Sequence, residues 1–164
     1  MNNFFLNDLL FLIPEIFFIF SIIVILIYSI FISNKYILLN NKKYNTPIIT
    51  SIVNNLIIYF LMILIILYFL NLNNFKILFT GQFVINYYSQ IGKILVLTIT
   101  ILCLLTFNSY LKNNKINNYE YLILTIISVL SVCLLLNTND LLHYYIIIEL
   151  QSLCFYTITA LKKN

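Results

Sequence analysis

The sequence has few charges and few residues that break helices. Only 9% of its 164 residues are charged, glycine and proline occur twice each, and arginine and tryptophan are absent. A soluble domain carries about 25% charged residues, so this composition excludes an ordinary soluble protein. The net charge of +4 depends on lysines grouped in particular loops, which argues against nucleic-acid binding.

Cysteines and cofactor motifs are also scarce. The three cysteines, Cys103, Cys133 and Cys154, lie in apolar runs, without a second cysteine or a histidine at metal-ligand spacing. We interpret them as small apolar residues rather than as a disulfide or a zinc site. Because the chain also lacks a glycine-rich phosphate loop, we expect it to bind no nucleotide, flavin, iron–sulfur cluster or metal.

Long apolar segments dominate what is present, and 62% of the residues are hydrophobic. A helix needs about 20 mostly apolar residues to cross the hydrocarbon core of a bilayer. The sequence therefore predicts an all-α polytopic membrane protein with a single transmembrane domain over residues 1–164. Five transmembrane helices are predicted, at about 8–32, 47–70, 85–111, 119–136 and 140–161.

The lysines predict the orientation of these spans, because short loops facing the compartment of synthesis collect positive charge. Lys76 lies in the long loop between the second and third spans, on the side of the membrane opposite to that compartment. Lys93, near the start of the third span, is expected to snorkel toward the same side as Lys76. The N-terminus is thus predicted to face out and the C-terminus to face the matrix or cytoplasm. The lysines of the inner side are Lys35, Lys42, Lys43, Lys112, Lys115, Lys162 and Lys163.

Most of the ionisable groups near span ends have a structural explanation. Glu15 and Glu120 are interpreted as first-turn acids favoured by the helix dipole, and Asp140 as the N-cap of the fifth span. His143 is six positions before Glu149, which places it about 120° around the helix. We interpret His143 as interfacial, while a place in a proton path through other helices stays open.

Glu149 has no such explanation. It lies nine residues after Asp140, about 14 Å along the helix axis and close to halfway across a core of about 30 Å. Two interpretations stay open: a carboxylate that handles protons, or a neutral glutamic acid that hydrogen-bonds helices together. Its helix face is shared by Tyr145, Ser152, Tyr156 and Thr159.

The stretch NDLLHYYIIIELQSLCFYTITALKK at 139–163 resembles the fifth transmembrane helix of subunit 2 of mitochondrial NADH:ubiquinone oxidoreductase, respiratory complex I. Glu149 matches the intramembrane glutamate of that family. IPEIF at 13–17 and NYEYLIL at 118–124 are weaker matches, to the starts of the family's first and fourth helices.

The resemblance implies an antiporter-like subunit of about fourteen helices, built from three lead-in helices and two inverted repeats. This chain would supply five of these helices, a partial antiporter-like fold without the family's buried lysine. A split subunit, whose other helices and lysine come from a second chain, is the expected explanation. A shortened sequence is the alternative.

The function implied by the resemblance is proton translocation coupled to electron transfer from NADH to ubiquinone, with no redox chemistry in this chain itself. Glu149 would carry the proton, with possible contributions from Tyr145, Ser152, Tyr156 and His143. The implied location is the mitochondrial inner membrane, with the N-terminus in the intermembrane space, the C-terminus in the matrix, and other membrane-arm subunits and lipids as partners. Two alternatives stay open: a non-transporting scaffold or accessory subunit, and a cation/proton antiporter subunit outside respiration.

Overall fold

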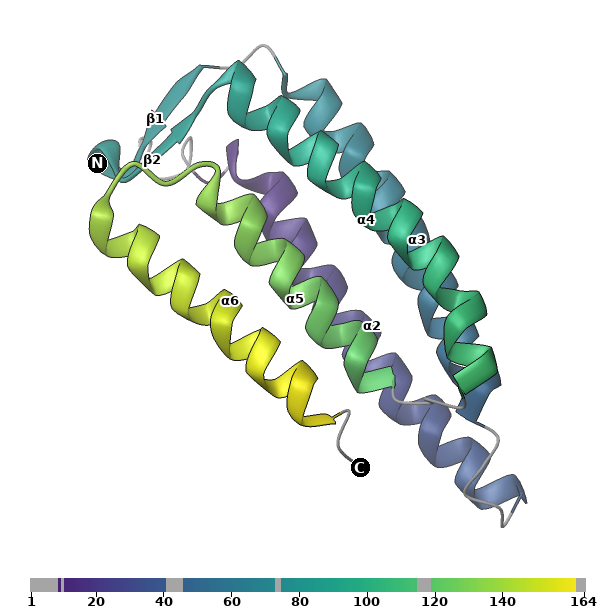
Figure 1. Cartoon of the computed structure of the whole chain (residues 1–164). Coiled ribbons are helices and arrows are strands. Elements are labelled where there is room, and N and C mark those ends of the chain that lie inside the picture. Colours follow the sequence, from purple (N-terminus) through teal and green to yellow (C-terminus); the bar gives the residue numbers. More distant parts are fainter. Residues whose placement is uncertain (1–8, 10, 41–45, 73–74, 115–118, 162–164) are drawn as a thin grey trace.

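The computed structural model describes residues 9, 11–40, 46–72, 75–114 and 119–161. Within these ranges the chain forms five long helices and one β-hairpin (Figure 1). The hairpin consists of β1 (Lys76–Leu78) and β2 (Phe83–Ile85), with a short 3₁₀ turn, η1 (Phe79–Gly81), between them. The helices are α2 (Ile13–Asn40), α3 (Thr46–Leu70), α4 (Tyr87–Asn114), α5 (Tyr119–Leu135) and α6 (Leu141–Leu161).

Among the described residues, four helical segments are long and apolar enough to cross a membrane: Ile13–Ser33, Thr50–Leu70, Tyr87–Thr106 and Leu141–Leu161. The remaining helix, α5, is apolar but has only 17 residues. At 1.5 Å per residue its length is about 25 Å, close to the lower limit for a transmembrane helix. The prediction of an all-α polytopic membrane protein is confirmed, whereas the division into five full spans stays a prediction.

Local sequence explains where several helices begin. Pro14 and Pro47 are the second residues of α2 and α3, where a missing backbone N–H disrupts no helical hydrogen bond. Before α4, the backbone N–H of Asn86 donates to the Ser89 hydroxyl over 3.0 Å, and that hydroxyl donates to the Asn86 carbonyl over 2.8 Å. The first of these bonds is one half of a capping box, and together they stabilise the start of α4.

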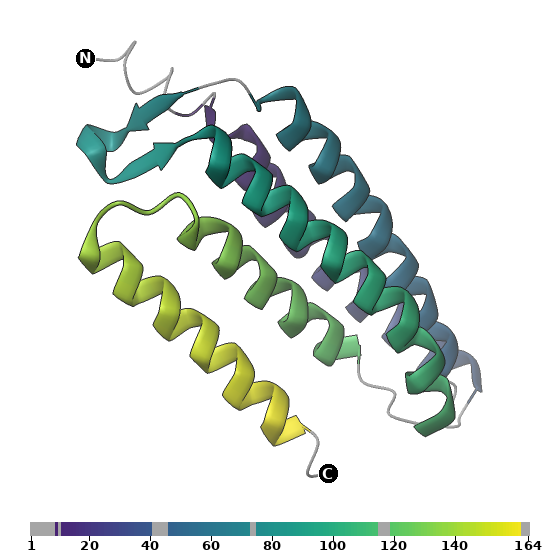
Figure 2. The same cartoon turned by 45° about the horizontal axis from the view of Figure 1, so that its top comes forward.

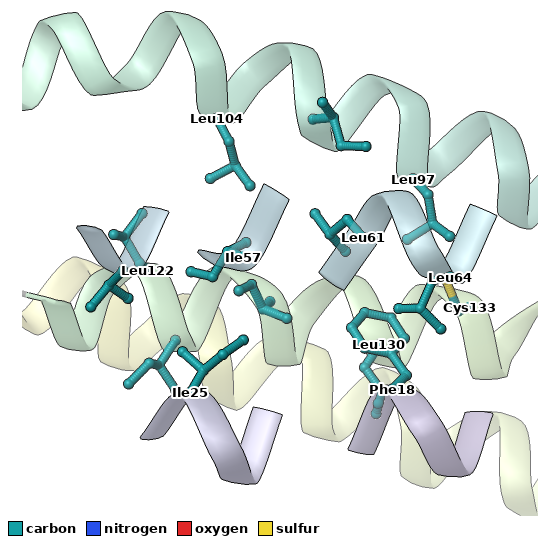
Figure 3. Close-up of a cluster of buried hydrophobic side chains, with 14 of the residues drawn as sticks. Phe18, Ile25, Ile57, Leu61, Leu64, Leu97, Leu104, Leu122, Leu130 and Cys133 are labelled. Carbon is teal, nitrogen blue, oxygen red and sulfur yellow. The ribbon is translucent and has the colours of Figure 1, made fainter. Parts of the chain in front are cut away.

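Helices α2, α3, α4 and α5 pack around one apolar core, and α6 packs against the outer side of α5 (Figures 1 and 2). Figure 3 shows apolar side chains of the four core helices pointing toward one another. Side chains such as Val53, Ile57, Leu64, Leu97 and Leu122 are completely buried there. Only Ile147 and Cys154 are buried on α6, so most of the surface of this helix is exposed in the described part of the chain.

The segment between α3 and α4, which the sequence predicted only as a long loop, forms the antiparallel hairpin. Its turn places Phe79, Thr80 and Gly81 in the left-handed region, with φ values of 47°, 56° and 99°. Glycine adopts this conformation readily, whereas the two preceding residues are strained by it. The paired residues are Lys76 with Ile85, Ile77 with Val84, and Leu78 with Phe83.

The hairpin is held against the turn that joins α5 to α6. The N–H of Val84 donates to the Asn137 carbonyl over 2.8 Å, and the N–H of Asn139 donates to the Gln82 carbonyl over 3.0 Å. The side-chain amide of Asn139 also donates to the Gly81 carbonyl over 3.2 Å. The position of α6 is therefore linked to the hairpin as well as to α5.

Helices α2, α4 and α6 all run from the hairpin end of the bundle to the opposite end (Figure 1). Lys42, Lys43, Lys115, Lys162 and Lys163, on which the predicted orientation depends, lie outside the described residues. The assignment of the two ends to the two sides of the membrane stays a prediction.

Candidate functional site

Glu149, the central candidate from the sequence, lies exposed on the outer side of α6. The two buried residues of α6, Ile147 and Cys154, are seven positions apart and hence share one face, which packs toward α5. Glu149 is two residues after Ile147, about 200° around the helix. Its carboxylate therefore points away from the bundle, and in the described part of the chain it makes no ion pair.

The predicted polar stripe of α6 follows the same outward direction. Tyr145 is 66% exposed and Tyr156 is 69% exposed. The hydroxyls of Ser152 and Thr159 each donate to a backbone carbonyl of their own helix, that of Glu149 and that of Tyr156, over 2.8 Å. These groups therefore lie on the outward side of α6, where no other helix of the described chain contacts them.

His143 and Asp140 lie at the start of α6, away from Glu149. Asp140 directly precedes the helix, and its carboxylate Oδ2 is 3.4 Å from Nδ1 of His143. The His143 ring packs edge-on against Phe83 of the hairpin, with ring centroids 5.5 Å apart. These contacts favour a role in joining α6 to the hairpin.

The structure reveals a buried ion pair that the sequence analysis missed. Nζ of Lys93 in α4 lies 2.5 Å from Oε1 of Glu15 in α2, and the two side chains are 0% and 6% exposed. The expectation that Lys93 snorkels to the interface is wrong, because its ammonium group is neutralised inside the bundle. Glu15 has the predicted place in the first turn of α2, yet it is buried as well.

Two further side chains complete the surroundings of this pair. Asn137, in the turn after α5, donates a hydrogen bond of 3.1 Å from Nδ2 to Oε1 of Glu15. Nζ of Lys93 lies 4.9 Å from the ring centroid of the fully buried Tyr68, a cation–π contact. Residues from α2, α3, α4 and the α5–α6 turn therefore meet around one pair of charges.

A signal in the sequence could have indicated this pair. The first and third spans run in the same direction, so positions near their starts lie at similar depths. Glu15 is the third residue of α2 and Lys93 the seventh of α4, a difference of about 6 Å at 1.5 Å per residue. Opposite charges at similar depth favour pairing, but only the packing shows that the two helices bring these side chains together.

Removing one member of the buried pair is expected to destabilise the chain strongly. Glu15→Gln or Lys93→Met leaves the other charge uncompensated, at a cost of about 3–5 kcal/mol, whereas the double variant removes both charges and should lose much less. Thermal unfolding of the full chain in lipid nanodiscs measures the difference. Lys76→Met is the matched control because Lys76 is exposed. A Lys93→Met variant as stable as this control would contradict the prediction.

Comparisons with known proteins cover nearly the whole chain, although no protein-family model matches it. It is 33% identical to NADH-ubiquinone oxidoreductase chain 2 of Marchantia polymorpha in an alignment of 163 positions that covers 96% of this chain. It is 31% identical to NADH-quinone oxidoreductase subunit N of Pelagibacter ubique over 160 residues, or 97% of this chain. Subunit N of Beijerinckia indica is 32% identical over 54% of this chain and 18% of its own length.

The chain spans only about a third of the length of the first two relatives, 31% of each. The match therefore concerns part of such a subunit, and it includes almost every residue described above. The chain is thus a relative of subunit 2, also called subunit N, of the NADH–quinone oxidoreductases and matches a part of it.

Proposed function

We propose that this chain is a membrane-arm component of respiratory complex I, which translocates protons while electrons pass from NADH to ubiquinone. The similarity of nearly the whole chain to NADH-ubiquinone oxidoreductase chain 2 supports this assignment. The observation that carries the proposed role is the place of Glu149, an ionisable group far inside a 21-residue apolar helix, on a face that its own bundle does not cover.

The surroundings of Glu149 follow from the properties of a bilayer. A charged side chain at the centre of the hydrocarbon core costs from about 3 to more than 10 kcal/mol, depending on the system. Such groups therefore face protein or a water-filled cavity. Because Glu149 points away from its own bundle, we infer that other protein segments or a hydrated channel adjoin the outward side of α6.

In this proposal, Glu149 takes up and releases a proton as the charge beside it changes. A basic group on an adjoining helix would stabilise the carboxylate, and displacement of that group would favour the neutral acid. Tyr145, Ser152 and Tyr156 line the same side of α6 and supply hydroxyl groups along the helix. The chain itself would perform no redox chemistry.

The proposed partner on this side of α6 is a second polypeptide that supplies the remaining helices of a split subunit. Exposed hydroxyls and a carboxylate on a transmembrane helix favour association with another helix, because lipid leaves them unpaired. Other membrane-arm subunits and lipids would surround the rest of the chain, in the mitochondrial inner membrane.

Purification of the native assembly in mild detergent tests this assignment. We expect the chain to migrate with NADH-oxidising subunits and with a second apolar polypeptide similar to the rest of subunit 2. We also expect the isolated chain to be less stable, because its polar side on α6 loses its partner. A monodisperse, functional particle formed by the chain alone would refute the split subunit, and an assembly without NADH-oxidising subunits would refute the complex I assignment.

Glu149→Gln distinguishes proton handling from a purely structural role. Glutamine keeps the size and most hydrogen bonds of a glutamic acid but cannot ionise. We expect the assembled Glu149→Gln complex to pump fewer protons per NADH oxidised, measured by proton uptake and NADH oxidation in reconstituted vesicles. Normal pumping by the assembled variant would contradict the proton-handling role and favour the scaffold.

Two variants serve as controls for this experiment. Glu149→Ala also removes the hydrogen bonds, leaving each partner group unpaired at a cost of about 1–3 kcal/mol, and should reduce assembly in addition. Cys154 lies on the same helix but on the face toward α5, so Cys154→Ala should preserve most of the pumping.

The grouped lysines predict that the hairpin end faces the intermembrane space. Single cysteines at Lys76, which is exposed in the hairpin, and at Lys163 would report on the two sides of the membrane, in a background without the native cysteines. In intact mitoplasts, a membrane-impermeant maleimide should label Lys76→Cys at once and Lys163→Cys only after the membrane is disrupted. The reverse pattern would show that the orientation is wrong.

A further inference from the structure

An open groove of about 710 Å³ lies between α2, α5 and α6, at the end of the bundle opposite the hairpin. There α5 begins, α6 ends and α2 passes beside them (Figure 1). Because α2 and α6 both pack against α5, the α5 residues form the floor of the groove, and Ile123 there is only 7% exposed. Leu26 and Ile30 of α2 line one wall, and Thr157 and Ala160 of α6 line the other.

The groove extends only part of the way across a membrane. On α5 it reaches from Tyr119 to Ile127, eight residues or about 12 Å along the helix axis. Its walls are formed by the last two turns of the candidate spans Ile13–Ser33 and Leu141–Leu161. A transmembrane helix of another protein would contact its neighbours over a core of about 30 Å. The short groove therefore favours a lipid, whose head lies at the interface, over such a helix.

The walls of the groove suit an acyl chain. The Thr157 hydroxyl donates to the backbone carbonyls of Leu153 and Cys154, over 3.0 and 2.8 Å, so its hydrogen-bonding needs are met within α6. Ala160, one turn closer to the end of α6, has a small side chain that leaves space beside the helix. Apart from this hydroxyl, both walls present aliphatic side chains, and these gain most from contact with hydrocarbon.

The outer end of the groove carries charge of both signs. Glu120, the second residue of α5, lines it with an exposed side chain that makes no ion pair with a described residue. Leu161 ends α6 at the same place, and the C-terminus of a helix carries a partial negative charge of about half an elementary charge. The start of α5 carries the opposite partial charge, which suits a phosphate. A head that combines an ammonium group with a phosphate complements this end of the groove.

We propose that the groove binds one molecule of phosphatidylethanolamine. An acyl chain lies along the α5 floor between the two walls, and the primary ammonium group of the head donates a hydrogen bond to the Glu120 carboxylate. An anionic phospholipid would leave this carboxylate without a cation. The inference depends on the membrane location of the chain and not on its proposed role in complex I.

Carbodiimide coupling tests the contact between Glu120 and the lipid. A membrane-permeant carbodiimide joins a carboxylate to an adjacent primary amine as an amide and leaves as a urea. The native assembly would be treated in vesicles of phosphatidylethanolamine and phosphatidylcholine, whose quaternary ammonium group cannot form the amide. Mass spectrometry should find the phosphatidylethanolamine amide several-fold more often on Glu120 than on Asp140, an exposed carboxylate at the hairpin end. Equal yields at the two positions would overturn the proposal.

A variant that fills the groove separates binding from simple exposure of the carboxylate. Ala160→Phe should abolish most of the lipid amide, while Glu120 still couples to the soluble amine glycine ethyl ester. Because Ala160 is exposed, this change leaves the apolar core intact. Thr98→Phe, at an exposed position on α4 outside the groove, is the matched control and should preserve the yield. An unchanged lipid amide in Ala160→Phe would refute the site.

Two further measurements exclude other occupants. Lys162 and Lys163 follow α6 in the sequence, so an anionic phospholipid is the competing ligand. Replacing phosphatidylcholine by phosphatidylglycerol, at constant phosphatidylethanolamine, should leave the yield of the amide unchanged, and a several-fold loss would favour the anionic lipid instead. A cryo-EM map of the native assembly should show lipid density in the groove, whereas a protein helix there would refute the proposal.

Discussion

The buried contact between Glu15 and Lys93 is the interaction on which the arrangement of the bundle depends. Both charges are removed from water, so each is tolerated only because the other lies within hydrogen-bond distance. The pair joins α2 to α4. Asn137 of the α5–α6 turn hydrogen-bonds to Glu15, and the Tyr68 ring of α3 contacts Lys93, so one polar cluster constrains four parts of the fold.

The chain handles its two intramembrane carboxylates in opposite ways. Glu15 has a cation, an amide and an aromatic ring around it, all from the same chain. Glu149 has an exposed side chain on a helix whose buried face is directed to α5. The first carboxylate has a cationic partner within the chain, whereas the second has none among the described residues. This contrast explains why α6 is the part of the chain that we assign to contact with other protein.

The hairpin connects these two regions. It accepts and donates backbone hydrogen bonds at the turn after α5, where Asn137 also reaches Glu15 through its side chain. Beyond this turn α6 begins, with His143 against Phe83 of the hairpin. A displacement of the turn would therefore act on the buried pair and on the helix that carries Glu149, because both depend on the same few residues.

The sequence alone determined the helical membrane fold, the short turn before α6 and the place of Glu149 well inside that helix, because each follows from hydrophobic length and from the rise of a helix. It also contained the resemblance around ELQSLCFY. Only the tertiary structure decided that Lys93 is buried against Glu15, that the loop after α3 is a hairpin, and that Glu149 faces outward. The reason is that periodicity describes one helix at a time, whereas ion pairing and exposure depend on which helices become neighbours and on how each is rotated.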